Sequence, residues 1–466
     1  MNTRREFLGA GAALAGLCAT RAELGAASHH PAWDQLPAIL ARIKAPVFPR
    51  RDFDITRFGA VGDGQMDSTE AINHAIAECS RAGGGRVVVP PKSVFLTGAV
   101  HLKSNVDLHV SAGARLLFHR DPKRYLPLVY TRWEGVECLN YAAFIYADQA
   151  ENIAVTGAGT LDGNCDCEHW WPWKGRTECG WSKGQPWQDQ ARNRLFAMGD
   201  KDVPLQERKF GEGSYLRPNF IQPCHSRNIL IEGVTLVNSP MWEINPVLCA
   251  NVTVRNIKVI SHGPNNDGCD PDSSKDFLIE NCYFDTGDDC IAIDSGRNRD
   301  GRRVGVPSEN IVIRNCEMKD GHGGITIGSM VSGGVRNVFA EKCKLSSPNL
   351  NQALRFKSNA MRGGVVENIY FRDIEIGQVS DAVLQIDLNY EEGPNGPERP
   401  VVRNIDIRDV TCKKAKYALN IQGYPAAIIS DIRLERCRFD NIASPDVVTF
   451  TERLALNDVR VNGRRA

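Results

Sequence analysis

A short motif recurs along most of this chain and limits what the chain can fold into. Each copy starts with Asn or Asp, continues with apolar residues at alternate positions, passes a polar turn and ends in a second short apolar row. The copies begin at Asn152, Asn228, Asn251, Asp276, Asn310, Asn337, Asn368, Asn404, Asp431 and, more weakly, Asp458. Alternating apolar residues predict strands, and one copy cannot bury its own apolar row, so the copies must stack.

Stacked short strands without helices between them predict an all-β fold, a single-stranded right-handed parallel β-helix. A leucine-rich repeat, the alternative solenoid, would need a Leu/Asn consensus that is absent. The opening residues differ, because their apolar positions have helical spacing: Ile72, Ala75, Ile76 and Cys79. A strand over 86–90 follows three glycines. We therefore expect a short N-terminal α/β capping module over 51–102, at one end of a β-helix catalytic domain that spans 51–466.

The first residues have the features of an export signal. Arg4 and Arg5 form a twin arginine, and a weakly apolar run rich in Gly and Ala follows to about Ala19. This run is too short to be a good membrane span. We expect a twin-arginine-type signal peptide over 1–27, a linker over 28–50, and export to the periplasm or secretion. An unprocessed N-terminal tail is the alternative.

The fifteen cysteines do not all predict disulfides. Several of them occupy one slot of the repeat, six positions after its first residue: Cys282, Cys316, Cys343 and Cys437. Other copies carry Val or Ile in that slot, which favours buried, unpaired thiols over metal ligands or disulfides. Three cysteines in a polar loop are better candidates for a disulfide: Cys165, Cys167 and Cys179.

The same repeat brings the residues that could do chemistry into register. The strands can be aligned on the serines that close them: Ser273, Ser295, Ser329 and Ser358. In this register Asp267 aligns with Asp289, and Asp288 aligns with His322. Neighbouring coils of a parallel sheet lie about 4.8 Å apart. We therefore expect one outward-facing patch to hold six side chains: Asp267, Asp288, Asp289, His322, Arg355 and Lys357.

Three carboxylates packed this closely repel one another, so at least one should keep its proton near neutral pH. Such a cluster can divide acid and base roles between similar side chains, and a basic pair beside it suits an acidic sugar. Asp and Asn also occupy β-helix turns for backbone reasons alone, which is our interpretation of Asn256, Asn281 and Asn315. For the outward-facing Asp270, Asp272 and Asp294 we expect a supporting or turn role.

Four short motifs, in order, resemble those of glycoside hydrolase family 28, the polygalacturonase family of pectin-cleaving β-helix enzymes. They are Asn265-Asn266-Asp267-Gly268, Gly287-Asp288-Asp289, Gly321-His322-Gly323 and Arg355-Phe356-Lys357. Asn266 stands where the family has Thr, and Phe356 where it has Ile; neither carries the chemistry. The resemblance implies inverting hydrolysis of α-1,4-linked galacturonic acid without metal or other cofactor. It implies that Asp288 is the general acid, that Asp267 and Asp289 activate water, that His322 tunes the acid, and that Arg355 and Lys357 bind the sugar carboxylate.

Long loops bear on where the polysaccharide is cut. An insertion between Asn164 and Tyr215 is rich in tryptophan, and a Thr131-Arg132-Trp133-Glu134 segment and a loop over 389–400 accompany it. These features resemble exo-acting bacterial members of the family, in which loops close one end of the groove. The alternative is that the tryptophans only pack the insertion onto the body.

Charge and composition narrow the partners. Lys plus Arg equal Asp plus Glu at 56 each, which argues against binding to nucleic acid or a membrane surface through bulk charge. The expected partner is an acidic pectic polysaccharide or oligosaccharide; the oligomeric state stays open. Alternatives on the same fold are a rhamnogalacturonan or other pectic side-chain hydrolase, a calcium-dependent pectate lyase and a non-catalytic carbohydrate-binding β-helix.

Overall fold

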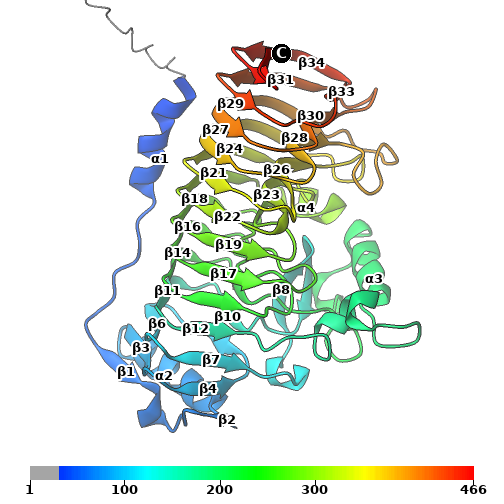
Figure 1. Cartoon of the computed structure of the whole chain (residues 1–466). Coiled ribbons are helices and arrows are strands. Elements are labelled where there is room, and N and C mark those ends of the chain that lie inside the picture. Colours follow the sequence, from blue (N-terminus) through cyan, green and yellow to red (C-terminus); the bar gives the residue numbers. More distant parts are fainter. Residues whose placement is uncertain (1–30) are drawn as a thin grey trace, which may run out of the picture.

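The computed structural model describes residues 31–466, so the expected signal peptide lies outside the described residues. Short strands are stacked in coils along one long axis, with the N-terminal end of the stack capped by a helix (Figure 1). Strands of successive coils pair in parallel, which confirms the prediction of a right-handed parallel β-helix. Among the described helices, none is long and apolar enough to cross a membrane.

The strands form three parallel sheets, each with one strand or strand segment per coil. The first sheet contains β1 (Asp52–Asp54), β3 (Gly85–Val89), β6 (Val106–Val110), β11 (Glu151–Gly157), β14 (Arg227–Glu232), β16 (Ala250–Arg255), β18 (Lys275–Glu280), β21 (Ser308–Arg314), β24 (Val335–Glu341), β27 (Val365–Ile376), β29 (Val401–Cys412), β31 (Ile429–Glu435) and β34 (Thr451–Asn457). The second contains β2 (Asp63–Asp67), β4 (Val94–Thr97), β7 (Arg115–Phe118), β12 (Thr160–Asp162), β15 (Thr235–Val237), β17 (Lys258–Ser261), β19 (Tyr283–Thr286), β22 (Glu317–Met318), β25 (Lys344–Leu345), the ends of β27 and β29, β32 (Arg438–Phe439) and β35 (Arg460–Val461), with β36 (Arg464–Arg465) antiparallel at its edge.

The third sheet carries the candidate site. Its strands are β5 (Val100–His101), β10 (Ile145–Asp148), β13 (Ile221–Cys224), β20 (Ile291–Ile293), β23 (Gly321–Ile327), β26 (Leu350–Lys357), β28 (Ala382–Asp387), β30 (Tyr417–Gln422) and β33 (Val447–Thr449). Isolated bridges through Ile244 and Cys269 join β13 to β20, so the sheet is continuous along the stack.

The first residue of each repeat turns the chain into the first sheet. These residues take positive φ values of 51–61°, a conformation that Asn and Asp tolerate better than most side chains. Their side chains also bond from coil to coil: Asn228 donates to Asn152 at 3.0 Å, and Asn251 donates to Asn228 at 2.8 Å. The same ladder continues from Asn310 to Asn404. The motif's leading Asn is therefore explained by a turn and by a side-chain ladder.

The cysteine predictions are confirmed where the structure tests them. The four repeat-slot cysteines are buried and unpaired in the core, as are Cys79 and Cys165. In the polar loop, Cys167 and Cys179 form a disulfide.

The capping helix forms where its apolar spacing predicts it. Helix α2 (Thr69–Arg81) buries Ile72, Ala75, Ile76 and Cys79 completely. It stops before Gly83 and Gly84, both with positive φ, and β3 follows.

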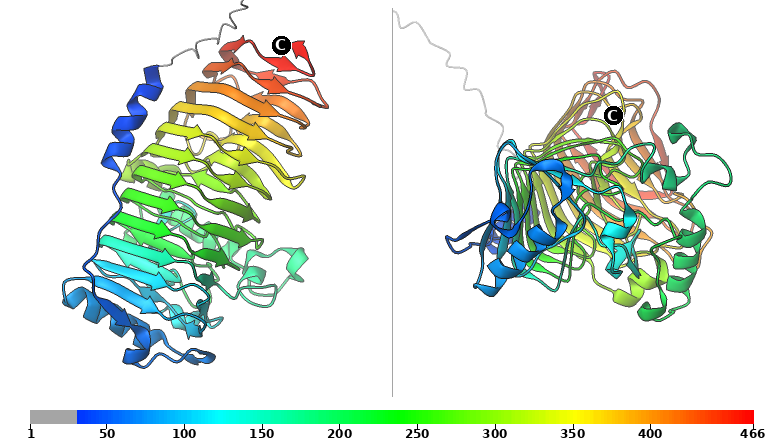
Figure 2. Two further views of the ribbon diagram at one scale, coloured as in Figure 1. Left: turned by 60° about the vertical axis from the view of Figure 1, so that its left-hand side comes forward. Right: turned by 90° about the horizontal axis from the view of Figure 1, so that it is seen from below.

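The segment expected to be a linker is partly helical. A 3₁₀ turn (Pro31–Gln35) and helix α1 (Leu36–Arg42) lie on the outside of the first sheet, and residues 43–50 run on along the stack to β1 (Figure 2). Trp33 packs edge-on against Phe339, with ring centroids 5.3 Å apart. An outward-facing apolar column of the sheet needs this cover: Leu278, Val312, Phe339 and Tyr370. We call residues 31–50 the N-terminal strap.

Extra elements gather on the side of the third sheet (Figure 1). They are the antiparallel hairpin of β8 (Val129–Trp133) and β9 (Val136–Asn140), helices α3 (Asp189–Asp200) and α4 (Asn298–Val304), and 3₁₀ turns at Trp171–Lys174, Thr177–Cys179 and Leu205–Glu207; two further 3₁₀ turns, Ile55–Phe58 and Pro122–Tyr125, lie nearer the N-terminal end. Two tryptophans anchor the insertion: Trp170 is buried in the core cluster, and the Trp171 indole donates to Ser239 O at 2.8 Å.

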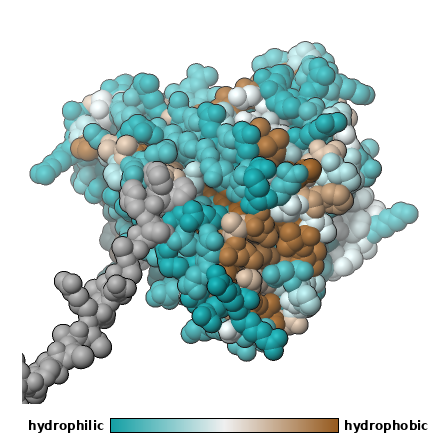
Figure 3. Space-filling model, turned by 90° about the horizontal axis from the view of Figure 1, so that it is seen from above, coloured by the Kyte–Doolittle hydropathy of each residue, from teal (hydrophilic) through white to brown (hydrophobic). Residues whose placement is uncertain are grey.

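Within residues 31–466, no helix caps the C-terminal end of the stack. Seen from above, an apolar area is exposed there among hydrophilic side chains (Figure 3). Val448 and Phe450 of the last coils are 40% and 49% exposed.

Candidate active site

The register predicted for the candidate site is confirmed. Ile291 pairs with Ile325, and Ile325 pairs with Leu354, so these apolar residues stack in the core. Arg355 pairs with Thr326 on the opposite face. The turns that precede these strands are also tied together, because Gly268 N donates to Asp289 O at 2.9 Å and His322 N donates to Asp288 O at 3.0 Å.

The three aspartates meet as expected. One oxygen from each of Asp267, Asp288 and Asp289 lies within 4.8 Å of the others. The Asp289 side chain is fully buried, and that of Asp288 is 13% exposed. None of the three points into the apolar interior formed by the repeat, so the patch inferred from sequence is present in the folded chain.

Asp288 and His322 form a hydrogen-bonded pair, with Nδ1 of the ring 2.9 Å from Oδ1. Burial acts to raise the pKa of the Asp288 carboxyl, but the hydrogen bond and charge of His322, with the nearby cations, lower it below its usual range. The hydrogen bond to Asp288 in turn raises the pKa of His322, against the effect of burial. The pair therefore favours a protonated imidazole beside a carboxylate.

Arg355 and Lys357 are held by Asp289. Lys357 Nζ lies 2.7 Å from Oδ2, and Arg355 Nη1 lies 3.1 Å from Oδ1. Burial alone would lower the pKa of Lys357, but the Asp289 charge raises it. The ring of Tyr390 lies 5.5 Å from Lys357 Nζ. The sequence predicted these cations in the patch but not that one aspartate would occupy both of them.

Asp267 has the opposite electrostatic environment. Burial, followed by the charges of Asp288, Asp270 and Asp289, raises its pKa well above the ordinary value. Its Oδ1 has no hydrogen-bond partner within residues 31–466. Of the three clustered carboxyls, Asp267 is thus the one whose surroundings favour the protonated form, whereas the family resemblance gives the acid role to Asp288.

The three neighbouring aspartates make the contacts of supporting residues. Asp272 bonds Nη1 of Arg132 at 2.7 Å and so fastens the β8–β9 hairpin to the third sheet. Asp270 and Asp294 each accept a backbone N–H, at 3.2 and 3.0 Å. Burial, together with the charge of Asp272, raises the pKa of Asp294 to about 7.

The site lies in a pocket of about 220 Å³. Its walls include catalytic-patch residues and cations from the insertion and α4 region: Lys174, Arg176, Arg192 and Arg297. Glu134 of the 131–134 segment and Glu391 of the 389–400 loop complete this part of the lining. The insertion's tryptophans are not among the lining residues, so they pack and shape the insertion. The sequence analysis did not predict the insertion's pocket-lining cations, because the insertion lies outside the repeat.

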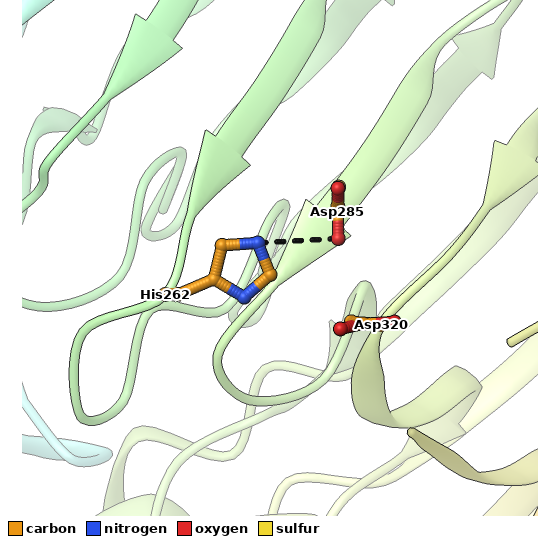
Figure 4. Close-up of side chains that lie close together, drawn as sticks. All are labelled: His262, Asp285 and Asp320. Carbon is orange, nitrogen blue, oxygen red and sulfur yellow. Dashed lines mark ion pairs between the residues drawn. The ribbon is translucent and has the colours of Figure 1, made fainter. Parts of the chain in front are cut away.

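A second polar group lies one row away, at the ends of β17, β19 and β22. Figure 4 shows His262, Asp285 and Asp320 close together, with His262 Nε2 3.2 Å from Asp285 Oδ1. Asp320 is already bound by the Ser347 hydroxyl and, at 3.0 Å, by the Asn349 amide. None of these three residues lines the pocket.

A parallel β-helix that presents clustered carboxylates, an imidazole and cations in one pocket has the groups that an enzyme cleaving an acidic carbohydrate by acid–base catalysis requires. The sequence model of the protein family described as "Glycosyl hydrolases family 28" matches residues 207–430 of this chain. The chain is 45% identical to a hyperthermoactive exopolygalacturonase from Thermotoga maritima, with a TM-score of 0.90, covering 93% of this chain and 97% of that one. The chain belongs to glycosyl hydrolase family 28, and it is a glycoside hydrolase.

Two curated relatives are more distant. A probable polygalacturonase of Vitis vinifera is 29% identical over 84% of this chain and 75% of its own length. An exo-poly-alpha-D-galacturonosidase of Dickeya chrysanthemi is 28% identical over 77% of this chain, and the match spans 62% of that relative's length.

Proposed function

We propose that this protein is an exo-acting galacturonosidase that hydrolyses α-1,4-linked galacturonic acid from the ends of pectic chains. The observation that carries the proposal is the pocket: Asp267 and Asp288 of the three-carboxylate cluster line it, together with cations of a long insertion. The exopolygalacturonase from Thermotoga maritima, similar over nearly its whole length, supports end-directed action.

The chemistry follows from the pairing of the side chains. Asp288 gives a proton to the glycosidic oxygen as the bond from that oxygen to the anomeric carbon breaks. A water held by Asp267 and Asp289 attacks the same carbon and passes its proton to a carboxylate. His322 supplies positive charge and a proton to Asp288 through the 2.9 Å hydrogen bond. Lys357 and Arg355 fix Asp289 and face the sugar carboxylate.

This assignment requires the cluster's proton to lie on Asp288 while Asp267 is ionised. The three carboxyls are close enough to titrate as a unit, so one proton is shared among them. The raised pKa of Asp267 favours the reverse assignment, with Asp267 as the acid. The two assignments predict different activities for Asp288→Asn and Asp267→Asn.

The proposal includes inversion of the anomeric configuration, because the resemblance to family 28 implies it. The oxygens that approach within 4.8 Å are closer than the roughly 6.5–9.5 Å between carboxyl groups usual for inverting glycosidases. Proton NMR of the first minutes of hydrolysis measures the outcome directly: an inverting enzyme yields the β-anomer first, and initial α-anomer would overturn this part of the proposal.

Product sizing on polygalacturonate tests the proposed mode of action. Monomer should be the dominant product from the first minutes, because the pocket accepts a chain end. Mixed oligomers at early times would overturn exo action. A substrate panel with methyl-esterified pectin and rhamnogalacturonan tests the linkage; preference for rhamnogalacturonan would replace the proposed substrate.

The donor set argues against a calcium-dependent lyase. Ca²⁺ takes about 6–8 oxygen ligands, but three carboxylates meet here, and one of them, Asp289, is already paired with the cations Lys357 and Arg355, whose charge would repel Ca²⁺. Two carboxylates then remain at the cluster. Hydrolysis should therefore proceed at an unchanged rate in chelator, with no absorbance from an unsaturated product; a chelator-sensitive rise in that absorbance would support elimination instead.

We infer export from the twin arginine at Arg4 and Arg5. The Cys167–Cys179 disulfide supports this, because disulfides persist in oxidising compartments outside the cytoplasm. Replacement of both arginines by lysine should leave the protein in the cytoplasmic fraction, and unchanged export of that variant would refute the twin-arginine route.

A further inference from the structure

The cations of the catalytic pocket differ in whether a carboxylate already neutralises them. Lys357 and Arg355 share Asp289. Arg192 of α3 donates through Nε to Glu134 at 2.9 Å. Arg297 Nη2 lies 3.5 Å from Glu391 Oε2. These four cations are paired with the protein's own acids.

Two pocket cations, both in the insertion, have no such acid. Across residues 31–466, neither Lys174 nor Arg176 makes a side-chain hydrogen bond or an ion pair within 4.0 Å, although both line the pocket. Burial lowers the pKa of Lys174; Glu134 offsets this, and the charges of Arg217, Arg192 and Arg176 add to it. The pocket lining therefore includes two cations that no carboxylate of residues 31–466 contacts within 4.0 Å.

The local structure fixes the backbone at these two residues. Lys174 ends the 3₁₀ turn Trp171–Lys174, whose first residue is fixed by the indole bond to Ser239. Gly175 follows with φ +78°, and a Cβ on it would lie 2.3 Å from the Trp187 ring nitrogen. Only glycine fits this close turn, which separates Lys174 from Arg176 while both face the pocket.

We propose that Lys174, with Arg176 beside it, binds the carboxylate of the terminal galacturonate and so selects chain ends that carry a free acid. The inference rests on the proposed function and assigns the recognition of one sugar to the insertion. A carboxylate in this position would receive charge-assisted hydrogen bonds from cations that are otherwise unpaired.

The recognition is distinct from that of the sheet. Arg355 and Lys357 lie on β26 beside Asp289, whereas Lys174 and Arg176 lie on the insertion, and all four line the pocket. Two adjacent sugars of one substrate can therefore be read by different pairs of cations. Methyl esterification of each sugar should be sensed separately.

The test uses digalacturonate and its two mono-methyl esters, one esterified on each sugar. Wild-type enzyme should cleave both esters more slowly than the free acid. Lys174→Met should lower kcat/KM for the free acid about 10-fold to 100-fold, as expected for the loss of a hydrogen bond to a charged group. On the ester that removes the carboxylate read by Lys174, the same variant should match wild type within about threefold. On the other ester it should lose as much as on the free acid.

Control variants separate recognition from packing. Lys183→Met makes the same change at an exposed position of the same insertion, outside the pocket lining, and should leave all three rates unchanged. Lys174→Arg keeps the charge and should recover most of the activity on the free acid. Thermal melting of each variant checks that the insertion stays folded.

The outcomes distinguish the inference from the function on which it rests. Equal loss of rate on all three substrates, or no loss on any, would overturn the role of Lys174 while wild-type cleavage of digalacturonate keeps the proposed function intact. Failure of the wild-type enzyme to release galacturonate from digalacturonate or polygalacturonate would overturn the proposed function itself.

Discussion

Replacing Asp288 by asparagine should remove the proton donor and leave the fold unchanged. Asp288 Oδ1 accepts hydrogen bonds from His322 Nδ1 at 2.9 Å and from the backbone N–H of Asp289 at 3.0 Å. An asparagine oxygen can keep both bonds, while its amide replaces the other oxygen and has no acidic proton. General acids contribute about 10²–10⁴-fold, which corresponds to about 3–5 kcal/mol of transition-state stabilisation. We expect kcat on digalacturonate to fall by that factor at an unchanged melting temperature.

The identity of the acid is decided by changing the leaving group. Galacturonosyl fluoride releases fluoride, a leaving group that needs little protonation. The kcat of Asp288→Asn on this substrate should therefore fall by less than about tenfold. Asp267→Asn should lose activity on both substrates, because water activation is needed in each case. Initial rates with the two substrates give the comparison, and Asp285→Asn, in the separate group at His262, is the matched control.

The reverse pattern would refute this reasoning. If Asp267→Asn is rescued by the fluoride and Asp288→Asn is not, then the proton held by Asp267 is the catalytic one and the electrostatics of the resting cluster outweigh the family assignment. Activity of Asp288→Asn within tenfold of wild type on digalacturonate would remove this residue from the mechanism altogether.

Three further perturbations test the site and the fold. The dependence of kcat on pH should be bell-shaped. With rising pH, kcat should increase as Asp267 loses its proton, at a pKa well above 3.8, and should decrease as His322 loses its proton, at a pKa above 6.5. His322→Asn should remove the decrease at high pH, and an unchanged profile would contradict the role of His322. Asp289→Asn strands two buried cations and should cost about 3–5 kcal/mol in urea unfolding, so a loss below about 1 kcal/mol would contradict the pairing. Trp33→Ala should cost about 3–5 kcal/mol by the same assay, while Val47→Ala, exposed on the same segment, should cost little.

The repeat made much of the site predictable. Period two fixes which residues face the core, and a strand-closing serine in each of four coils fixes their register, so Asp267 beside Asp289 and Asp288 beside His322 follow from spacing alone. The prediction of the carboxylate cluster did not require knowledge of any side-chain conformation, because neighbouring coils cannot slide past each other without exposing their apolar rows.

Contacts that depend on rotamers or on irregular loops were not predictable. Long Lys and Arg side chains can reach several partners, so their pairing with Asp289 across two coils depends on three-dimensional packing. Lys174 and Arg176 lie in a loop without a period. The cover of the first sheet did have a signal, an apolar residue at an outward position in successive repeats: Leu278, Val312, Phe339 and Tyr370. Such a column predicts a covering element, although not that residues 31–42 would supply it.

The N-terminal strap changes how a stack of this kind should come apart. In a solenoid each coil contacts only its neighbours, so the ends can fray while the middle persists. Here Lys44 exchanges two hydrogen bonds with Asn251, Arg42 binds Asp276 and Trp33 contacts Tyr370, all far along the sequence. The N-terminal strap thus connects the N-terminal cap to coils in the middle of the stack. The cap and these coils should therefore unfold together, in one cooperative transition.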